Sequence, residues 1–164
     1  MVASLMPRDA VLALRASQDR LRTAVWGARM GLWELDFGSE RTVWFNDWCA
    51  QNDIDPCDGE DHVDRWDANI HPDDIAEAAR RFAEHVAGKS EYYDAEYRVR
   101  TRGGKWLWVF ERSLVVEGDA AGAARRMVSI CMDSTARREQ VVGEHFHGEQ
   151  ARQVALLHQR RAAG

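Results

Sequence analysis

The chain has 164 residues and a formal net charge of −5. This length is enough for one domain with its own packed core and a few additional helices. Basic and acidic residues are interspersed and form no basic block, so we expect no nucleic-acid partner. The three cysteines contain no CxxC pair, and no apolar run approaches the roughly 18 residues of a membrane span. We therefore expect a cytoplasmic chain with no metal site and no membrane segment.

The first predicted element is a helix over residues 8–28. Its apolar side chains recur in alternate steps of three and four, which is the spacing of a narrow coiled-coil stripe. This stripe can pack on the helix's own domain or on a second copy of the chain, and the pattern leaves both alternatives open. In the second case Leu14, Leu21 and Val25 are the candidate dimer contacts.

Two short strands are predicted next. In GLWELDF, the apolar residues Trp33, Leu35 and Phe37 alternate with acidic residues, which is the period of a half-buried strand. A GSER turn follows, and TVWF then predicts a second short strand.

Residues 46–70 contain Asn, Asp, Gly or Pro every few positions. Such a composition favours short helical turns, here anchored by Trp48 and Trp66. A long helix is predicted to begin at Pro72 and to run to Gly88, because proline at a helix start and acidic residues in the first turn are typical N-terminal signals. Its expected buried stripe is Ile75, Ala79, Phe82 and Val86.

From residue 91 the apolar period falls to two, which predicts a long hairpin. The first strand has Tyr93, Ala95, Tyr97 and Val99 on one face. Gly103-Gly104 can supply the positive φ of a tight turn, and the aromatic residues Trp106, Trp108 and Phe110 then alternate with Lys105 and Glu111. We expect the aromatic row to face the core.

RMVSICMD predicts the last strand, so the three later strands can form an antiparallel meander with the two early strands at its edge. The predicted fold class is α+β, a five-stranded antiparallel sheet with helices packed on one face. After Asp133, Ser134 and Thr135, all good N-caps, a C-terminal helix is expected. Its thin apolar stripe, which includes Val142, Phe146 and Leu157, favours a connector or dimer arm over a core helix.

The order and local sequence of these elements resemble a PAS sensory domain with its PAC portion. IHPDD at 70–74 is similar to the opening of the family's long helix, and residues 82–109 are similar to its stretch from the helix end through the first hairpin. CMDSTARRE at 131–139 is similar to the Asp-Ile-Thr signature that joins the last strand to a signalling helix. The resemblance predicts a sensor domain over 29–134, between flanking helices at 1–28 and 135–164.

The resemblance implies a non-enzymatic sensor that binds a small ligand or a partner. It would relay the change through Asp133 and Thr135 to an output domain such as a histidine kinase or a diguanylate cyclase, as a homodimer. The alternative is a ligand-free interaction and dimerisation module. The candidate pocket residues are Trp33, Trp48, Trp66, Phe82, His85, Tyr97, Trp108 and Arg112.

No cofactor is predicted from the residues. His85 could ligate a haem iron, as a helix histidine does in some PAS sensors, but an isolated histidine in a similar helix ending is frequent in relatives that have no known cofactor. Cys49 and Cys57 lack the Asn-Cys-Arg setting of a flavin photosensor, and no catalytic motif is present. Arg112 falls in the aromatic row, where it could hold an anionic ligand group or be released to water where the strand bulges.

Overall fold

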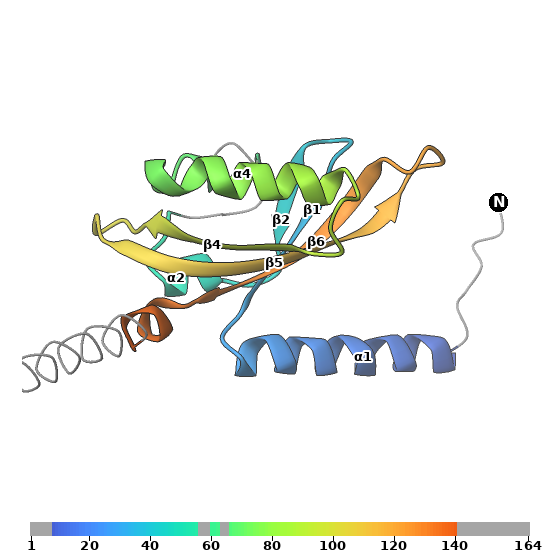
Figure 1. Ribbon diagram of the computed structural model, residues 1–164. Helices are drawn as coiled ribbons and strands as arrows, with labels where there is room; N and C mark the ends of the chain where they lie inside the picture. Colours follow the sequence, from blue (N-terminus) through green and yellow to red (C-terminus); the bar gives the residue numbers. More distant parts are fainter. Residues whose placement is uncertain (1–7, 56–59, 63–65, 141–164) are drawn as a thin grey trace, which may run out of the picture.

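The computed structural model describes residues 8–55, 60–62 and 66–140. An antiparallel sheet carries helix α4 on one side, and helix α1 lies on the opposite side (Figure 1). This arrangement confirms the predicted α+β class. The elements are α1 (Arg8–Gly27), β1 (Gly31–Asp36), β2 (Arg41–Trp44), α2 (Trp48–Gln51), β3 (Glu60–His62), α4 (Pro72–Val86), β4 (Tyr93–Arg100), β5 (Trp106–Gly118) and β6 (Ala124–Asp133). Residues 135–140 form the start of a further helix, here called the exit helix.

The described sheet has the strand order β3-β2-β1-β6-β5-β4, and every neighbouring pair is antiparallel. β4, β5 and β6 form the predicted meander, and β1 joins its edge by pairing with β6. The short strand β3 was not predicted, because it lies in a segment dominated by turn residues. It extends the sheet by pairing with β2.

Helix α4 begins as its sequence predicts. His71 has extended backbone angles and caps the helix, since its Nδ1 accepts a hydrogen bond from the backbone N–H of Asp73 at 3.2 Å. Pro72 occupies the first helical position, where its missing N–H costs no intrahelical hydrogen bond. The buried stripe is rotated from the predicted one, because Ala78 and His85 are buried whereas Ile75 is 37% exposed.

The hairpin between β4 and β5 corrects the expectation for the aromatic row. Its loop is five residues long, residues 101–105, so Arg100 pairs with Trp106 and Tyr97 pairs with Val109. Tyr97 and Val109 are buried on the face covered by α4, and Trp108 therefore lies on the other face. The row of Trp106, Trp108 and Phe110 does not face the core.

The core lies between α4 and the sheet and is made mainly of inward residues of the four strands β1, β4, β5 and β6. Its largest completely buried side chains include Tyr97, Val99, Val109 and Met127. Trp33 and Leu35 of β1 belong to this core, as their alternation predicts. Among the described residues, none of the helices combines the length and the apolar character that crossing a membrane requires.

Candidate functional site

A cluster of polar side chains lies inside this core, on the inward faces of three strands. It consists of Tyr97 on β4, Glu111 and Ser113 on β5, and Ser129 on β6, and it is called here the carboxyl cluster. One carboxyl oxygen of Glu111 accepts hydrogen bonds from Ser129 at 2.8 Å and from Ser113 at 3.3 Å. Its other oxygen accepts a hydrogen bond from the Tyr97 hydroxyl. The strand pairing brings these groups together, because Ser113 lies opposite Ser129.

The charge on Glu111 has no cationic partner in the carboxyl cluster. Glu111 is 3% exposed, and the groups among the described residues that hydrogen-bond to it are hydroxyls. Burial raises the pKa of the Glu111 carboxyl above its ordinary value, against the hydrogen bonds from Tyr97, Ser129 and Ser113, which lower it. Burial and the nearby Glu111 charge also raise the pKa of the Tyr97 phenol. The cluster therefore holds protons more tightly than the same groups do in water.

Four tryptophans adjoin the carboxyl cluster and connect it to β1, β2 and α2. Trp44 packs against Trp33, Trp48 and Trp66, with ring centroids 6.1, 6.2 and 5.5 Å apart. Trp66 donates a hydrogen bond from Nε1 to the Tyr97 hydroxyl at 2.9 Å. Trp33, Trp48, Trp66 and Tyr97, four of the predicted pocket residues, therefore belong to one connected interior set.

Phe82 and His85 reach the same interior from α4. Phe82 packs against Phe37 and Tyr93. His85 is buried, and its Nε2 accepts a hydrogen bond from the backbone N–H of Val115 at 3.1 Å, so its Nδ1 carries the proton directed at the Ser90 carbonyl oxygen, 3.0 Å away. Since both ring nitrogens are engaged by backbone groups, His85 fastens the end of α4 to β5 and offers no free nitrogen to a haem iron.

Trp108 and Arg112 lie on the outer face of the sheet, so their prediction as interior pocket residues is wrong. Arg112 is exposed and makes two hydrogen bonds of 2.6 Å with the carboxylate of Asp94, a bidentate pair that lowers the pKa of Asp94. Trp108 is half-buried beneath the guanidinium groups of Arg98 and Arg138. β5 is regular at both positions, so Arg112 reaches water because its face of the sheet is exposed and not because the strand bulges there.

The start of the exit helix is attached to β5 by hydrogen bonds to one residue. The backbone N–H of Ser134 donates to the carbonyl oxygen of Trp108 at 2.8 Å, and the Thr135 hydroxyl accepts from the N–H of Trp108 at 3.0 Å. Asp133 in turn accepts a hydrogen bond from the N–H of Thr135 at 2.8 Å. Asp133 and Thr135, the predicted relay residues, therefore join the last strand, the exit helix and β5.

A second attachment links the exit helix to the edge strand β4. Glu96 forms ion pairs with Arg137 and Arg138, each with a nitrogen–oxygen distance of 2.7 Å. Burial acts to raise the pKa of Glu96, but Ser134 and these two arginines outweigh it, so the pKa of Glu96 lies below its ordinary value. Sequence analysis did not single out Glu96, because its partners are far away in the chain.

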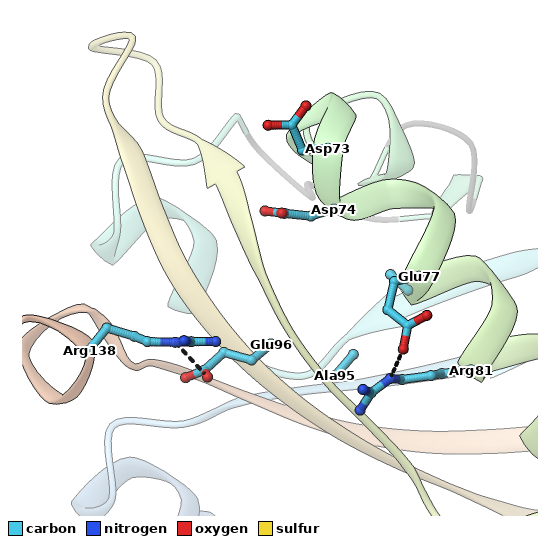
Figure 2. A pocket seen from close by; sticks show the side chains of 8 residues that line it. Asp73, Asp74, Glu77, Arg81, Ala95, Glu96 and Arg138 are labelled. Carbon is cyan, nitrogen blue, oxygen red and sulfur yellow. Dashed lines mark hydrogen bonds and ion pairs between the residues drawn. The ribbon is translucent and has the colours of Figure 1, made fainter. Parts of the chain in front are cut away.

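A groove with a volume of about 290 Å³ lies beside this junction, and Figure 2 shows the side chains that line it. Side chains of α4 line one wall, and Glu96 with Arg138 of the exit helix lies on the other. The charges in the groove are already paired: Glu77 binds Arg81, and Asp74 binds Arg98. The Arg98 pair lowers the pKa of Asp74 and ties the first turn of α4 to β4. The groove thus adjoins the Glu96–Arg138 pair, while its other charges stabilise the contact of α4 with β4.

The remaining predicted positions have different surroundings. Leu14 and Leu21 on α1 are more than half exposed, whereas Val25 is buried. Val142, Phe146, Leu157 and Cys57 lie outside the described residues. Cys49 and Cys131 are buried in α2 and β6. Within the described ranges no group of three or more His, Cys, Asp or Glu side chains is placed to hold a metal ion.

Sequence analysis missed Glu111, Ser113 and Ser129 as interior residues. A signal for them was present, since an inward strand position that carries Ser or Glu among apolar neighbours is unusual. This signal is informative only when the pairing of β4 with β5 is known, because the pairing decides which residues of β5 face inward.

A family model described as the PAS fold matches residues 43–131 of the chain. A sensory box histidine kinase/response regulator from Burkholderia thailandensis has a similar crystal structure, with 28% sequence identity and a TM-score of 0.70. This similarity covers 82% of this chain and 98% of that chain. No curated protein matches the chain in sequence.

Two further solved structures share the fold. The N-terminal domain of a diguanylate cyclase with a PAS/PAC sensor, from Marinobacter aquaeolei, has 17% identity and a TM-score of 0.57, over 66% of this chain and 98% of that chain. A domain of a putative light and redox sensing histidine kinase from Haloarcula marismortui has 19% identity and a TM-score of 0.56, over 71% of this chain and 99% of that chain.

Proposed function

Because the chain belongs to the PAS fold family, we propose that it is a cytoplasmic signal-sensing domain without catalytic activity of its own. In this proposal the interior between α4 and the sheet receives the signal, and the exit helix passes it to an output domain. A histidine kinase or a diguanylate cyclase is the output class suggested by the similar structures. The sensor domain spans 29–134, with residues 1–28 and 135–164 as its flanking helices.

The observation that carries the proposal is the attachment of the exit helix to the sheet at Trp108. Both backbone groups of Trp108 are hydrogen-bonded to the first residues after β6, and β5 also carries Glu111 on its inward face. A change in the carboxyl cluster that shifts β5 would therefore move the anchor of the exit helix. A ligand can favour such a shift only if it binds one of the two arrangements more tightly.

The input is a small ligand or a partner that acts on the carboxyl cluster and the adjoining tryptophans. A buried polar cluster in an apolar core generally lowers stability relative to an apolar core of the same shape, so it favours a functional role for this site. Asp133 and Thr135 are the relay residues in this mechanism, and Glu96 with its two arginines holds the next turn of the exit helix against β4.

The test begins with native mass spectrometry and an absorbance spectrum of freshly purified chain, to detect a retained small molecule. Hydrogen–deuterium exchange of residues 131–140 is then measured before and after that molecule is removed, or, for a bare chain, before and after addition of a cell metabolite extract. Faster or slower exchange in the exit helix supports the relay. Exchange that changes only in the interior, with 131–140 unaffected, would contradict it.

The alternative, a dimerisation module without a ligand, is favoured by a separate observation. Apolar side chains are exposed on two sides of α1: Leu14 at 53% and Leu21 at 55% share the predicted stripe, whereas Leu12 at 54% and Trp26 at 62% lie on the other side. Exposed apolar residues that share one stripe, as Leu14 and Leu21 do, are typical of a protein–protein contact. We propose that α1 pairs with a second copy of the chain, an arrangement that is also compatible with the sensor function.

The dimer is tested by sedimentation velocity of the double variant Leu14→Glu, Leu21→Glu. The matched control is Ala13→Glu, Ala24→Glu, which adds the same charge at exposed positions away from both Leu14 with Leu21 and Leu12 with Trp26. A monomer for the first variant and a dimer for the control support the contact. The same mass for both variants would remove α1 from the interface.

A further inference from the structure

Trp44, Trp66 and Tyr97 form a row of contacting aromatic side chains that ends at a hydrogen bond to Glu111. Ligand binding alone does not require this arrangement. We propose that Trp44, Trp66, Tyr97 and Glu111 form a redox-active site, in which a diffusible one-electron oxidant removes an electron through the tryptophans while Tyr97 passes its phenolic proton to Glu111. The oxidant belongs to the class of small radical oxidants, such as nitrogen dioxide or a peroxyl radical. This activity belongs to the interior and does not depend on the exit helix.

The electron path consists of rings in contact. The centroids of Trp44 and Trp66 are 5.5 Å apart, and the Trp66 indole N–H donates a hydrogen bond to the Tyr97 oxygen at 2.9 Å. Trp44 and Trp66 are half-buried, whereas Tyr97 is 1% exposed. An oxidant in solution can therefore reach the edge of a tryptophan but cannot touch the phenol, and the electron must leave Tyr97 through its aromatic neighbours.

The proton has an acceptor in place. A tyrosine that loses its electron and its proton together is a better electron donor than one that must form a radical cation. The Tyr97 hydroxyl donates its hydrogen bond to a carboxyl oxygen of Glu111, so the proton moves along an existing hydrogen bond. The products are the one-electron-reduced oxidant, the neutral Tyr97 radical and a neutral Glu111 carboxylic acid.

The change in charge favours transfer of the proton from Tyr97 to Glu111 when Tyr97 is oxidised. At a pH above the raised pKa of Glu111, the carboxyl cluster before oxidation holds one buried negative charge that no cation within it compensates. After oxidation the cluster is neutral, which relieves the cost of burying that charge. The Tyr97 oxygen then accepts hydrogen bonds from both Trp66 and the protonated Glu111, and both stabilise the radical. A thiol or ascorbate can return the electron, and the proton returns from Glu111 to Tyr97.

The chain offers a clean experiment because it has three tyrosines, Tyr92, Tyr93 and Tyr97. In the variant Tyr92→Phe, Tyr93→Phe every tyrosyl radical must come from Tyr97. The full chain is photo-oxidised with a flash-generated ruthenium(III) polypyridyl complex, a one-electron oxidant, and the radical is identified by electron paramagnetic resonance and transient absorption. We expect a tyrosyl radical that forms after a tryptophan radical and that forms more slowly in D2O.

Two changes in this background test the roles of the partners. Glu111→Gln removes the proton acceptor, so most of the tyrosyl signal should be lost while the tryptophan radical persists. Trp66→Phe replaces the readily oxidised indole and its N–H donor to Tyr97 with a phenyl ring, and it should delay Tyr97 oxidation. Circular dichroism verifies that each variant is folded. If the double variant Tyr92→Phe, Tyr93→Phe does not fold, wild type is compared with Tyr97→Phe instead. The tyrosyl radical that forms more slowly in D2O should then be present in wild type and absent in Tyr97→Phe. A tryptophan radical alone in the background variant, or an unchanged tyrosyl signal in Glu111→Gln, would overturn the proposal.

Discussion

The hydroxyl of Thr135 accepts a hydrogen bond from the backbone N–H of Trp108 at 3.0 Å, across 27 residues of sequence. This bond places the first turn of the exit helix directly on β5, the strand that carries Glu111 on its other face. A short, well-defined attachment of this kind is easier to loosen than a packed interface, because it depends on a few hydrogen bonds.

Replacing Thr135 with Val should weaken this attachment. The N–H of Trp108 loses its acceptor, at an expected cost of about 1 kcal/mol in the free energy of unfolding. Hydrogen exchange at residues 134–140 should accelerate by more than the global destabilisation explains. Thr135→Ser keeps the hydroxyl and serves as the control; if it and Thr135→Val exchange at the same rate, the hydroxyl does not hold the helix.

The Glu111 carboxyl should give the stability of the chain a particular pH dependence. Because its pKa is raised on folding, the folded state holds the proton to higher pH than the unfolded state does. The stabilisation associated with this proton is complete below the ordinary value of 4.5 and is lost as pH rises through the folded pKa. One such proton contributes a slope of about 1.4 kcal/mol per pH unit.

Glu111→Gln removes this titration, so the decrease in unfolding free energy above the ordinary pKa should be smaller in the variant. Chemical denaturation of both proteins over a pH series measures the difference. Glu34→Gln, on the outer face of β1, is a control that leaves the interior carboxyl in place. Parallel pH profiles for wild type and Glu111→Gln would show that Glu111 is not the titrating group.

Gly31→Ala should be strongly destabilising because the start of β1 is tightly enclosed. A Cβ atom at Gly31 would lie 2.4 Å from the Cys131 sulfur, 3.0 Å from the Trp48 ring and 3.1 Å from the Trp44 ring. Overpacking of this kind typically costs about 1–3 kcal/mol.

Gly27→Ala provides the matched control, because a Cβ at Gly27 meets nothing within 4 Å. Thermal unfolding of the two variants should show a clear loss for Gly31→Ala and little change for Gly27→Ala. Similar melting temperatures would mean that the three neighbours of Gly31 can move aside without cost.

Trp48→Ala and Trp108→Ala should differ in their effect on stability. Trp48 is 2% exposed inside the tryptophan group, so its loss should cost about 3–5 kcal/mol. Trp108 is half-buried on the outer face, and its loss should cost less while releasing Arg138 from its ring. Denaturant midpoints measure the difference, and an equal loss in both variants would contradict the outward position of Trp108.

The pattern of the sequence was sufficient for the order and type of the main elements. The helix at α4, the five main strands and the α+β class follow from apolar periods and from local signals such as Pro72 and the acidic residues after it. These features depend on neighbours in the chain, which is why they can be predicted without the structure. The resemblance to the PAS fold rested on the same local segments, and the family match confirms it.

Which residues of β5 face the core could not be predicted from the same local patterns. A two-residue turn at Gly103-Gly104 would pair Val99 with Trp108 and direct the aromatic row inward. The actual loop includes Thr101 and Lys105, whose hydrogen bonds close it, and the pairing shifts by one residue. A shift of one residue reverses both faces of a strand, so Glu111 enters the core and Trp108 leaves it.

The sequence by itself determined which segments become helices and strands, because hydrophobic periods and capping residues act over a few neighbouring positions. Only the tertiary structure decided that Glu111 meets Tyr97, Ser113 and Ser129, and that Glu96 meets the arginines of the exit helix. Those contacts depend on strand register and on the path of the chain after β6, and both are set by packing between segments that are distant in sequence.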